Sequence, residues 1–539
     1  MVATVFDYQA HGLVASATRL PLPGAGPATI GDVLARQLTR DPDRLALVGR
    51  GGRLTYAQLD AEADRTAVEF HDAGITRYDR IAACLPNDID IVIALLACAR
   101  IGAIWVGVNR PLAPPEKAFI LADSGAQLYL TDAAGAEEIR PALNELPGLR
   151  VVQLGAAIME GGVHGFVQHP KPKPYPRPDV DSYEPAAIAY TSGTTGRPKG
   201  AVHSHHNLLL PGAVAVAEER FGPDCHQGVM LPLTILNLVV LAPLTAFQDG
   251  AACVCMDSMK PEDIADWIAD EKVGHFASVP TVVQDLLTSD NVDPRDLATL
   301  GHPDIGGAGI AESFQRLYRE RFGKHMTVAY GMTEAPTIVT KTSPDEAPVE
   351  ELCGRAVPQL EVLVVDEGDA PLSPGAIGEI CVRPAGAGPY AGVYTTMLGY
   401  WNRPEDTEAA LAQGMYHTGD LGYLDDTGQL FIRGRQKELI IRGGANVYPA
   451  EVERVLVTDA RVSDAAVLGI DDERLGQRVV AVVQSECDAA ELEEALRALC
   501  ERQLARYKVP DRILVVAALP RNAMNKVIKP ELVGLFAEQ

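Results

Sequence analysis

The stretch AAIAYTSGTTGRPKG, residues 186–200, decides the fold and the first functional expectation. It begins as an apolar run typical of a buried strand and continues into a loop of glycines and hydroxyl residues that ends in Arg197 and Lys199. Glycines let backbone amides approach phosphate oxygens, hydroxyls donate further hydrogen bonds, and a lysine adds positive charge. The composition therefore predicts a phosphate-binding loop. An exposed Ser/Thr/Gly loop is the simpler alternative, and the spacing does not match the Walker pattern.

Around this loop, helical and strand-like segments alternate. Residues 55–74 have helical periodicity and RIAACL at 80–85 reads as a short buried strand, which predicts α/β layers with parallel sheets. PLSPGAIGEICVRP at 371–384 and the segment 429–432 read as short strands of a β-rich subdomain. After Arg435 an amphipathic helix and two strands predict a small α+β domain.

At 539 residues the chain is longer than one core usually supports. We therefore expect an α/β protein with two domains. The large N-terminal domain, residues 1–434, contains αβ-layered subdomains and the β-rich subdomain. A small mobile α+β domain follows at 435–539.

The charge balance excludes some partners. Lys and Arg number 47 against 72 Asp and Glu, a formal charge of −25, which disfavours nucleic acid and anionic membrane surfaces. The longest apolar stretch, from Ile91, is broken by Arg100 and Gly102, so we expect a buried helix running into a strand and no membrane span. The N-terminal residues do not resemble a signal peptide, and the scattered cysteines favour reduced thiols. We therefore expect a cytoplasmic protein.

Five further segments accompany the loop in a fixed order: GGAG at 306–309, YGMTE at 330–334, HTGD at 417–420, RGRQKELIIRGG at 433–444 and LPRNAMNKVIK at 519–529. With the loop, they closely resemble the signatures of the adenylate-forming (ANL) superfamily, particularly acyl-CoA synthetases and 4-coumarate:CoA ligases. The resemblance covers nearly the whole chain. It implies that ATP, Mg²⁺ and coenzyme A are used together with a small-molecule carboxylic acid.

The resemblance assigns a role to each motif. Thr191, Glu334 and Lys526 are the expected catalytic residues, and Glu334 is also the expected Mg²⁺ ligand. The other nucleotide or CoA contacts it implies are Ser192, Gly193, Thr194, Thr195, Gly196, Lys199, Gly307, Ala308, Gly309, Tyr330, Gly331, Met332, Thr333, Asp420, Arg435, Lys437, Gly443 and Gly444.

Within this set, the implied roles differ. The ring of Tyr330 stacks on adenine, Thr333 binds phosphate, and Asp420 and Arg435 hold the ribose. Lys437 is the hinge of the C-terminal domain, while Gly443 and Gly444 allow the pantetheine arm to approach. The basic residues of the motifs would gather into a pocket for anions in an otherwise acidic protein.

The expected reaction has two steps. The acid attacks the α-phosphorus of ATP and releases pyrophosphate, and the CoA thiol then attacks the acyl-adenylate, which makes the enzyme a ligase forming carbon–sulfur bonds. The C-terminal domain rotates between the steps in this family. Two alternatives stay open: a ligase that uses a carrier protein or no thiol, and a non-catalytic nucleotide-binding homologue.

The sequence departs from the family where the acid is expected to bind. Thr234 and Ile235 replace the usual aromatic residue or histidine, and Asn237 stands where plant 4-coumarate ligases usually have tyrosine. Asn525 replaces the usual glycine before the catalytic lysine. The expected acid is aromatic, alicyclic or medium-chain, and the residues expected to bind it are His206, Thr234, Asn237, Gly307 and Gly331. A metal role for the histidines at 203–206 is disfavoured, because no second ligand cluster lies at a suitable spacing.

Overall fold

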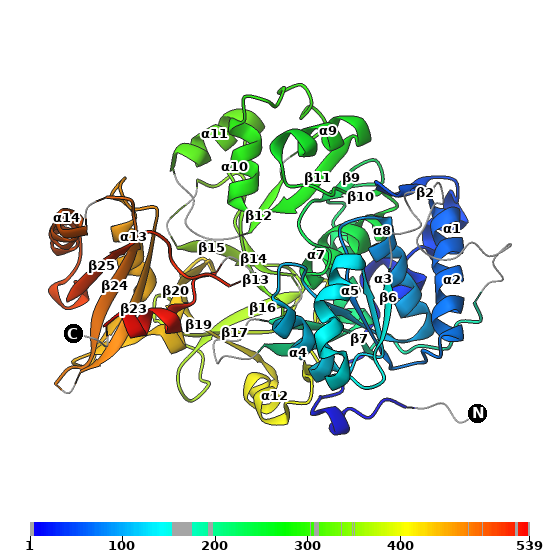
Figure 1. Ribbon diagram of the computed structural model, residues 1–539, viewed down its shortest axis with the longest axis horizontal. Helices are drawn as coiled ribbons and strands as arrows, with labels where there is room; N and C mark the ends of the chain where they lie inside the picture. The colour runs from blue at the N-terminus through cyan, green and yellow to red at the C-terminus, as the bar shows by residue number, and fades with distance from the viewer. Residues whose placement is uncertain are drawn as a thin grey trace. The chain divides into compact units, whose positions relative to one another are not determined.

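The computed structural model describes residues 5–153, 175–191, 198–301, 303–306, 312–335, 337–347, 349, 351–472, 474–487, 489–522 and 526–536 (Figure 1). The chain divides into two compact units. The first is Met1–Val362 with Val382–His417, and the second is Leu363–Cys381 with Thr418–Gln539. The domain boundary predicted at 434/435 falls inside the second unit and stays a prediction.

The first unit contains a seven-stranded sheet in the order β18-β8-β7-β4-β3-β5-β6. Its strands are β3 (Arg80–Cys84), β4 (Ile104–Gly107), β5 (Leu128–Thr131), β6 (Arg150–Gln153), β7 (Pro185–Thr191), β8 (Lys199–Ser204) and β18 (Gly399–Tyr400). β3, β4, β5, β6 and β7 pair in parallel, whereas β8 and β18 pair antiparallel with their neighbours. The predicted parallel α/β layer is therefore present.

The long apolar run forms helix α3 (Ile89–Ile101), every residue of which is buried. The Asp88 side chain caps its N-terminus by accepting a hydrogen bond from the amide of Ile89, and Gly102 ends it in the left-handed conformation with φ 73°. Arg100 lies fully buried on this helix because Asp60 and Asp64 pair with its guanidinium. Among the residues described, no helix combines the length and apolar character that crossing a membrane requires.

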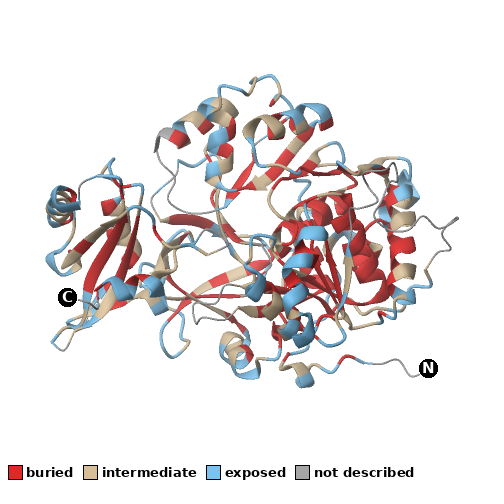
Figure 2. Ribbon diagram, in the orientation of Figure 1, coloured by how far each residue is buried: buried red, intermediate tan, exposed pale blue. Residues whose placement is uncertain are grey.

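A second sheet of the first unit runs in the order β15-β14-β13-β12-β11-β9-β10-β1-β2. The bounds are β1 (Leu45–Gly49), β2 (Gly52–Thr55), β9 (His226–Val229), β10 (Cys253–Cys255), β11 (Val273–Ser278), β12 (Asp304–Gly306), β13 (Val328–Met332), β14 (Thr337–Lys341) and β15 (Leu352–Ala356). Figure 2 shows in red the buried residues that lie along the strands.

Helices complete the first unit. They include α1 (Ala35–Arg40), α2 (Tyr56–Asp72), α4 (Pro114–Ser124), α5 (Ala133–Ile139), α6 (His205–Ala217), α7 (Leu236–Val239), α8 (Thr245–Asp249), α9 (Pro261–Glu271), α10 (Pro280–Thr288), α11 (Glu312–Phe322) and α12 (Pro404–Ala410). The helix predicted at 55–74 is α2, which starts at a capping box formed by Thr55 and Gln58. A π-helical turn, η6 (Val240–Leu244), joins α7 to α8.

Three strands, β16 (Leu360–Val365), β17 (Gly378–Pro384) and β19 (Tyr416–Leu424), contain the residues at which the division between the units falls. β19 pairs antiparallel with β20 (Leu430–Arg435) in the second unit. Of these strands, β17 and β20 lie in the two segments from which the β-rich subdomain was predicted, whereas β16 and β19 were not predicted.

The rest of the second unit is a small α+β assembly. Its sheet contains β21 (Ile440–Arg442), β22 (Ala445–Val447), β23 (Asp464–Asp472), β24 (Gly476–Gln484) and β25 (Arg512–Val516). Apolar residues of α13 (Pro449–Leu456) and α14 (Ala489–Gln503) share one core with these strands, and α15 (Lys529–Val533) packs in a second cluster. The predicted fold class, mixed α/β with a small C-terminal α+β unit, is confirmed.

Candidate active site

The predicted phosphate loop is flanked by two antiparallel strands. Thr191 ends β7, Lys199 begins β8, and the two residues face each other across the ladder. The Thr191 hydroxyl donates to the Lys199 carbonyl across 3.5 Å. Ser192–Arg197 lie outside the described residues, as do Gly307–Gly309 of the second glycine-rich motif. The described strands therefore bring both ends of the loop together.

The Lys199 side chain has two partners within the first unit. Its ammonium pairs with the carboxylate of Asp406, at the start of α12, and lies 5.2 Å from the centre of the Tyr400 ring. An anion that binds Lys199 must therefore share this cation with Asp406. Neither Tyr400 nor Asp406 was among the residues predicted from the sequence.

Tyr330, Gly331 and Met332 belong to β13, and Thr333 and Glu334 follow in the turn. The phenol of Tyr400 donates to the Glu334 carboxylate across 3.0 Å. Burial, reinforced by the negative charge of Glu334, raises the pKa of Tyr400 above its usual range, so this phenol stays protonated and donates. Two predicted residues distant in sequence, Lys199 and Glu334, thus meet at one tyrosine.

A buried histidine fixes the backbone beside Glu334. His203 on β8 places Nε2 2.8 Å from the carbonyl of Thr333, and its Nδ1 lies 3.1 Å from the Asn207 amide nitrogen. A carbonyl only accepts, so Nε2 carries the proton and Nδ1 accepts from Asn207. Burial lowers the pKa of His203 to about 4, which keeps the ring neutral. His203 is therefore a positioning residue for the Thr333–Glu334 turn.

The neighbouring histidines also have structural partners. Nδ1 of His205 accepts from the amide of Ile30 across 3.3 Å. The ring of His206 stacks on Tyr183 with centroids 4.6 Å apart, and its Nε2 donates to the carbonyl of Leu20 across 3.0 Å. These contacts engage one ring nitrogen each of His205 and His206, while Nε2 of His205 and Nδ1 of His206 are buried without a hydrogen-bond partner among the described residues. The role of His206 in acid binding stays a prediction.

The predicted ribose-binding pair lies in the second unit. Asp420 on β19 is the direct cross-strand partner of Arg435 on β20, and Nε of Arg435 lies 3.1 Å from the Asp420 carboxylate. Asp420 is buried, whereas the Arg435 side chain is 48% exposed. A carboxylate has several acceptor positions, so the contact with Arg435 leaves Asp420 able to accept from a diol.

The remaining motif residues of this unit occupy turns and surface positions. Lys437 lies in the short turn Gln436–Glu438 directly after β20. Gly443 and Gly444 join β21 to β22 with φ 58° and 83°, a conformation that favours glycine. Lys526 is exposed, and its amide donates to the Asn522 side chain across 3.0 Å. Asn525 lies outside the described residues.

Several basic residues of the motifs have acidic partners within the second unit. The Lys529 ammonium lies 2.7 Å from Glu438 and 2.9 Å from Glu453, and Arg442 lies 2.6 Å from Asp511. Their charges are therefore partly neutralised by the protein.

Two residues that were not predicted from the sequence, Asn87 and Gly107, contact the segment that is expected to bind the acid. The Asn87 side chain, after β3, accepts from the amide of Leu233 and donates to the carbonyl of Leu231, both at 2.8 Å. At Gly107, an added Cβ would lie 2.0 Å from the Thr234 carbonyl oxygen. Only glycine therefore lets β4 approach this segment so closely.

The segment itself is mostly buried. The Thr234 hydroxyl donates to the Asn109 side chain across 3.4 Å, and Asn237 lies on the short helix α7. Leu236, Leu238 and Val239 are buried. Thr234 and Asn237, the polar residues at which the sequence indicated a departure from the family pattern, thus lie in one short stretch that leads into α7.

The sequence and the fold were compared with those of known proteins. The family model described as AMP-binding enzyme matches residues 34–401, and the model of the AMP-binding enzyme C-terminal domain matches residues 451–526. The chain is 32% identical to a feruloyl-CoA synthase from an Amycolatopsis species, over 93% of this chain and 98% of that protein. It is 31% identical to the fatty acid–[acyl-carrier-protein] ligase ScoC of Streptomyces coeruleorubidus, over 92% and 94%.

A solved structure agrees with these relatives. The o-succinylbenzoate CoA synthetase MenE from Bacillus subtilis, in complex with its acyl-adenylate intermediate, superposes with a TM-score of 0.79. The two sequences are 27% identical, and the alignment covers 93% of this chain and 97% of that one. The similarity thus extends over both compact units.

Proposed function

Because the chain belongs to the family of AMP-binding enzymes, we propose that it is an ATP-dependent ligase that joins a carboxylic acid to coenzyme A through an acyl-adenylate. AMP and pyrophosphate leave, and a carbon–sulfur bond forms. The observation that carries the proposal is the meeting of Lys199 and Glu334 at Tyr400, beside the strands that flank the phosphate loop.

The first step brings two anions together, the acid and the triphosphate. The flanking strands pair Thr191 with Lys199 at the two ends of the loop, and the hydroxyls and amides of the loop would bind phosphate oxygens. Lys199 supplies positive charge once a phosphate competes with Asp406 for it. Such positioning and charge neutralisation lower the barrier to in-line attack without a protein nucleophile.

Glu334 fits the role of magnesium ligand. Mg²⁺ commonly takes one or two protein carboxylates and fills its shell with phosphate oxygens and water. Tyr400 engages one oxygen of the carboxylate and His203 fixes the preceding carbonyl, so Glu334 is oriented before nucleotide binds. A bound Mg²⁺ would neutralise charge on the phosphates.

The second unit supplies the other groups. Asp420 accepts from the ribose hydroxyls while Arg435 orients it. Lys526 bridges the acid carboxylate and the phosphate, and Gly443 and Gly444 let the pantetheine arm approach. Since Lys526 and the two glycines serve different steps from one unit, a rotation about Lys437 between the steps follows.

The acceptor is assigned to CoA over a carrier protein. The feruloyl-CoA synthase uses CoA by its name, whereas ScoC uses an acyl carrier protein, and both cover nearly the whole chain. At Gly444 an added Cβ would meet nothing within 4 Å, so this turn leaves room for the pantetheine arm. Because ATP and CoA are both available in the cytoplasm, we infer that the enzyme acts there; free cysteines, as in this chain, are common in that reducing compartment.

The test is pyrophosphate release across aromatic, alicyclic and medium-chain acids, with CoA or a pantetheinylated carrier protein as acceptor. The proposal expects release with some acids and a thioester with CoA. A thioester formed only on the carrier protein would reassign the acceptor. ATP binding without pyrophosphate release for any acid would support the non-catalytic alternative.

A further inference from the structure

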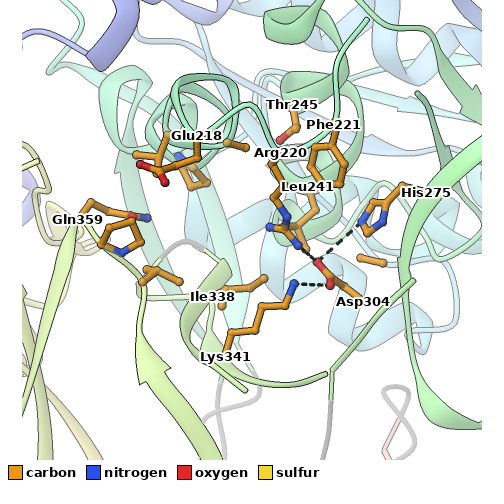
Figure 3. A pocket seen from close by; sticks show the side chains of 16 residues that line it. Glu218, Arg220, Phe221, Leu241, Thr245, His275, Asp304, Ile338, Lys341 and Gln359 are labelled. Atoms are coloured by element: carbon orange, nitrogen blue, oxygen red, sulfur yellow. Dashed lines mark hydrogen bonds and ion pairs between the residues drawn. The ribbon is translucent and has the colours of Figure 1, made fainter. Parts of the chain in front are cut away.

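The first unit contains a cavity of about 180 Å³ that the roles above do not use (Figure 3). Its wall includes apolar side chains from α6, η6 and β14, among them Val214, Leu241 and Ile338. Charged side chains line the same cavity. A space with an apolar wall and a few convergent polar groups is typical of a small-molecule site.

The charged end is built around one carboxylate. Asp304, on β12, is 6% exposed, and its Oδ1 lies 2.5 Å from the Lys341 ammonium. Arg220, just after α6, pairs with the other oxygen, and Nε2 of His275 lies 3.7 Å from it. Burial disfavours the charged form, but these basic neighbours outweigh it and hold the pKa of Asp304 well below its usual range.

One carboxylate thus faces a lysine, an arginine and a histidine. The other acid of the lining, Glu218, lies away from this cluster beside Gln359 (Figure 3) and accepts from the Tyr390 hydroxyl at 2.5 Å. The cluster around Asp304 therefore carries a local excess of positive charge. An ammonium has three donors and a guanidinium has five, so Asp304 does not exhaust them.

The strand that carries Lys341 also connects the cavity to the predicted acid site. Ile338 of β14 is the cross-strand partner of Gly331, which was predicted to contact the acid. The ladder pairs Tyr330 with Thr340 but Gly331 with Ile338, so Val339 is an extra residue that forms a bulge. Three positions apart, Ile338 and Lys341 would normally face opposite sides of the sheet, yet the bulge turns both toward the cavity.

A second segment makes the same connection. Leu241, in the cavity wall, lies on the helical segment that continues from Thr234 and Asn237. The cavity therefore adjoins two segments that are predicted to contact the acid. Its charged cluster lies farther along β14 from the Glu334 turn than Ile338 does.

We propose that this cavity receives the far end of the acid substrate, and that this end carries a second carboxylate bound by Lys341 and Arg220. The assignment rests on the proposed ligase function. A second carboxylate would balance the excess positive charge and accept charge-assisted hydrogen bonds from Lys341 and Arg220. A methyl end would exclude water from these charged groups and offer no hydrogen bond in its place.

The test compares acids of one skeleton that end in carboxylate, primary amide or methyl, by pyrophosphate release with ATP. In the wild type, kcat/KM for the diacid should exceed that for the methyl-terminated acid by about tenfold or more. Lys341→Met should lower this ratio about tenfold, mainly by raising KM for the diacid. Arg220→Gln should act in the same direction through a different side chain.

Asp304→Asn should have the opposite effect. It removes the carboxylate that competes for Lys341 and Arg220, so it should raise the ratio of kcat/KM for the diacid to kcat/KM for the methyl-terminated acid. A wild-type preference for the methyl or amide end would overturn the proposal. So would an equal loss for all three acids in Lys341→Met, because that result marks a purely structural ion pair.

A binding measurement separates this proposal from the ligase function. The diacid should raise the melting temperature of the wild type more than the methyl-terminated acid does, and Lys341→Met should abolish that difference. The expected shift without pyrophosphate release for any acid would contradict the ligase and support the cavity assignment. Release from methyl-terminated acids with no shift from the diacid would overturn the cavity assignment and retain the ligase.

Discussion

The phenol of Tyr400 donates a hydrogen bond to the carboxylate of Glu334 across 3.0 Å, although 65 residues separate them in the chain. The same ring lies beneath the ammonium of Lys199. Tyr400 therefore links the predicted magnesium ligand to the lysine of the phosphate loop, and it orients both before any nucleotide arrives.

Replacing Tyr400 with phenylalanine tests this link. The ring and its contact with Lys199 stay, but Glu334 loses a donor. A hydrogen bond to a charged group contributes about 1.5–3 kcal/mol, so kcat/KM for MgATP should fall about tenfold or more. Pyrophosphate release measured over a range of Mg²⁺ and ATP concentrations checks it.

Tyr394→Phe is the matched control for this change. Tyr394 is also buried, but within the described residues its hydroxyl has no hydrogen-bond partner, so its loss should leave kcat/KM nearly unchanged. Equal losses in the two variants would show that the Tyr400 hydroxyl has no specific role.

The buried histidines predict how stability depends on pH. Burial lowers the pKa of His203, His205 and His206 to about 4 from a model-compound value of 6.5. A depressed folded-state pKa means that the unfolded chain binds protons first as pH falls. The contribution of the three neutral histidines to the free energy of unfolding is therefore complete above about pH 6.5 and is lost progressively as the pH falls toward 4.

His206→Phe isolates one of these groups, since phenylalanine keeps the stacking on Tyr183 and removes the titrating ring. Between pH 7.5 and pH 5 the wild type should lose about 2 kcal/mol more stability than the variant. Trp105, Trp267 and Trp401 all lie in the first unit, so tryptophan fluorescence in urea follows its unfolding.

His71→Phe serves as the control for the pH experiment, because His71 is exposed near the end of α2. The free energy of unfolding of His71→Phe should change with pH as that of the wild type does. Parallel pH dependences for the wild type and His206→Phe would contradict the assignment of a neutral buried ring at this position.

The close approach at Gly107 predicts a substitution that disturbs the acid site. In Gly107→Ala the new methyl group meets the Thr234 carbonyl, so the segment that follows must shift. Overpacking of this kind typically costs about 1–3 kcal/mol, and KM for the acid should rise more than KM for ATP. Melting temperature and steady-state kinetics measure the two effects.

Gly534→Ala provides the comparison, because an added Cβ there meets nothing within 4 Å and its φ is −60°. It should leave both KM values and the melting temperature nearly unchanged. An unshifted KM for the acid in Gly107→Ala would show that the segment from Thr234 does not shape the acid site.

Local sequence patterns were sufficient to predict helices and strands, but they did not predict which distant residues contact each other. Alternation and periodicity predicted the strand that ends at Thr191 and the helix that contains Leu492, because burial of one face leaves a period in the sequence. Family motifs indicated Glu334 and Asp420. The phosphate loop at Ser192–Arg197 and the motif at Gly307–Gly309 lie outside the described residues, so their roles stay predictions.

The residues that were missed share one property. His203, Tyr400 and Asn87 act through hydrogen bonds to segments far away in the chain, at Thr333, Glu334 and Leu233. No local period or turn signal records which distant carbonyl or carboxylate a buried side chain will meet. Such pairs become visible only when the fold brings the strands together.

Lys526→Ala tests most directly whether adenylate formation and thioester formation are separate half-reactions. Lys508→Ala is the control in the same unit, because Lys508 is already paired with Glu451. Pyrophosphate release from ATP and acid is measured first, and thioester formation from supplied acyl-adenylate and CoA second. Lys526→Ala should abolish the first reaction and leave the second largely intact. Comparable losses in both reactions, or full pyrophosphate release, would contradict the account.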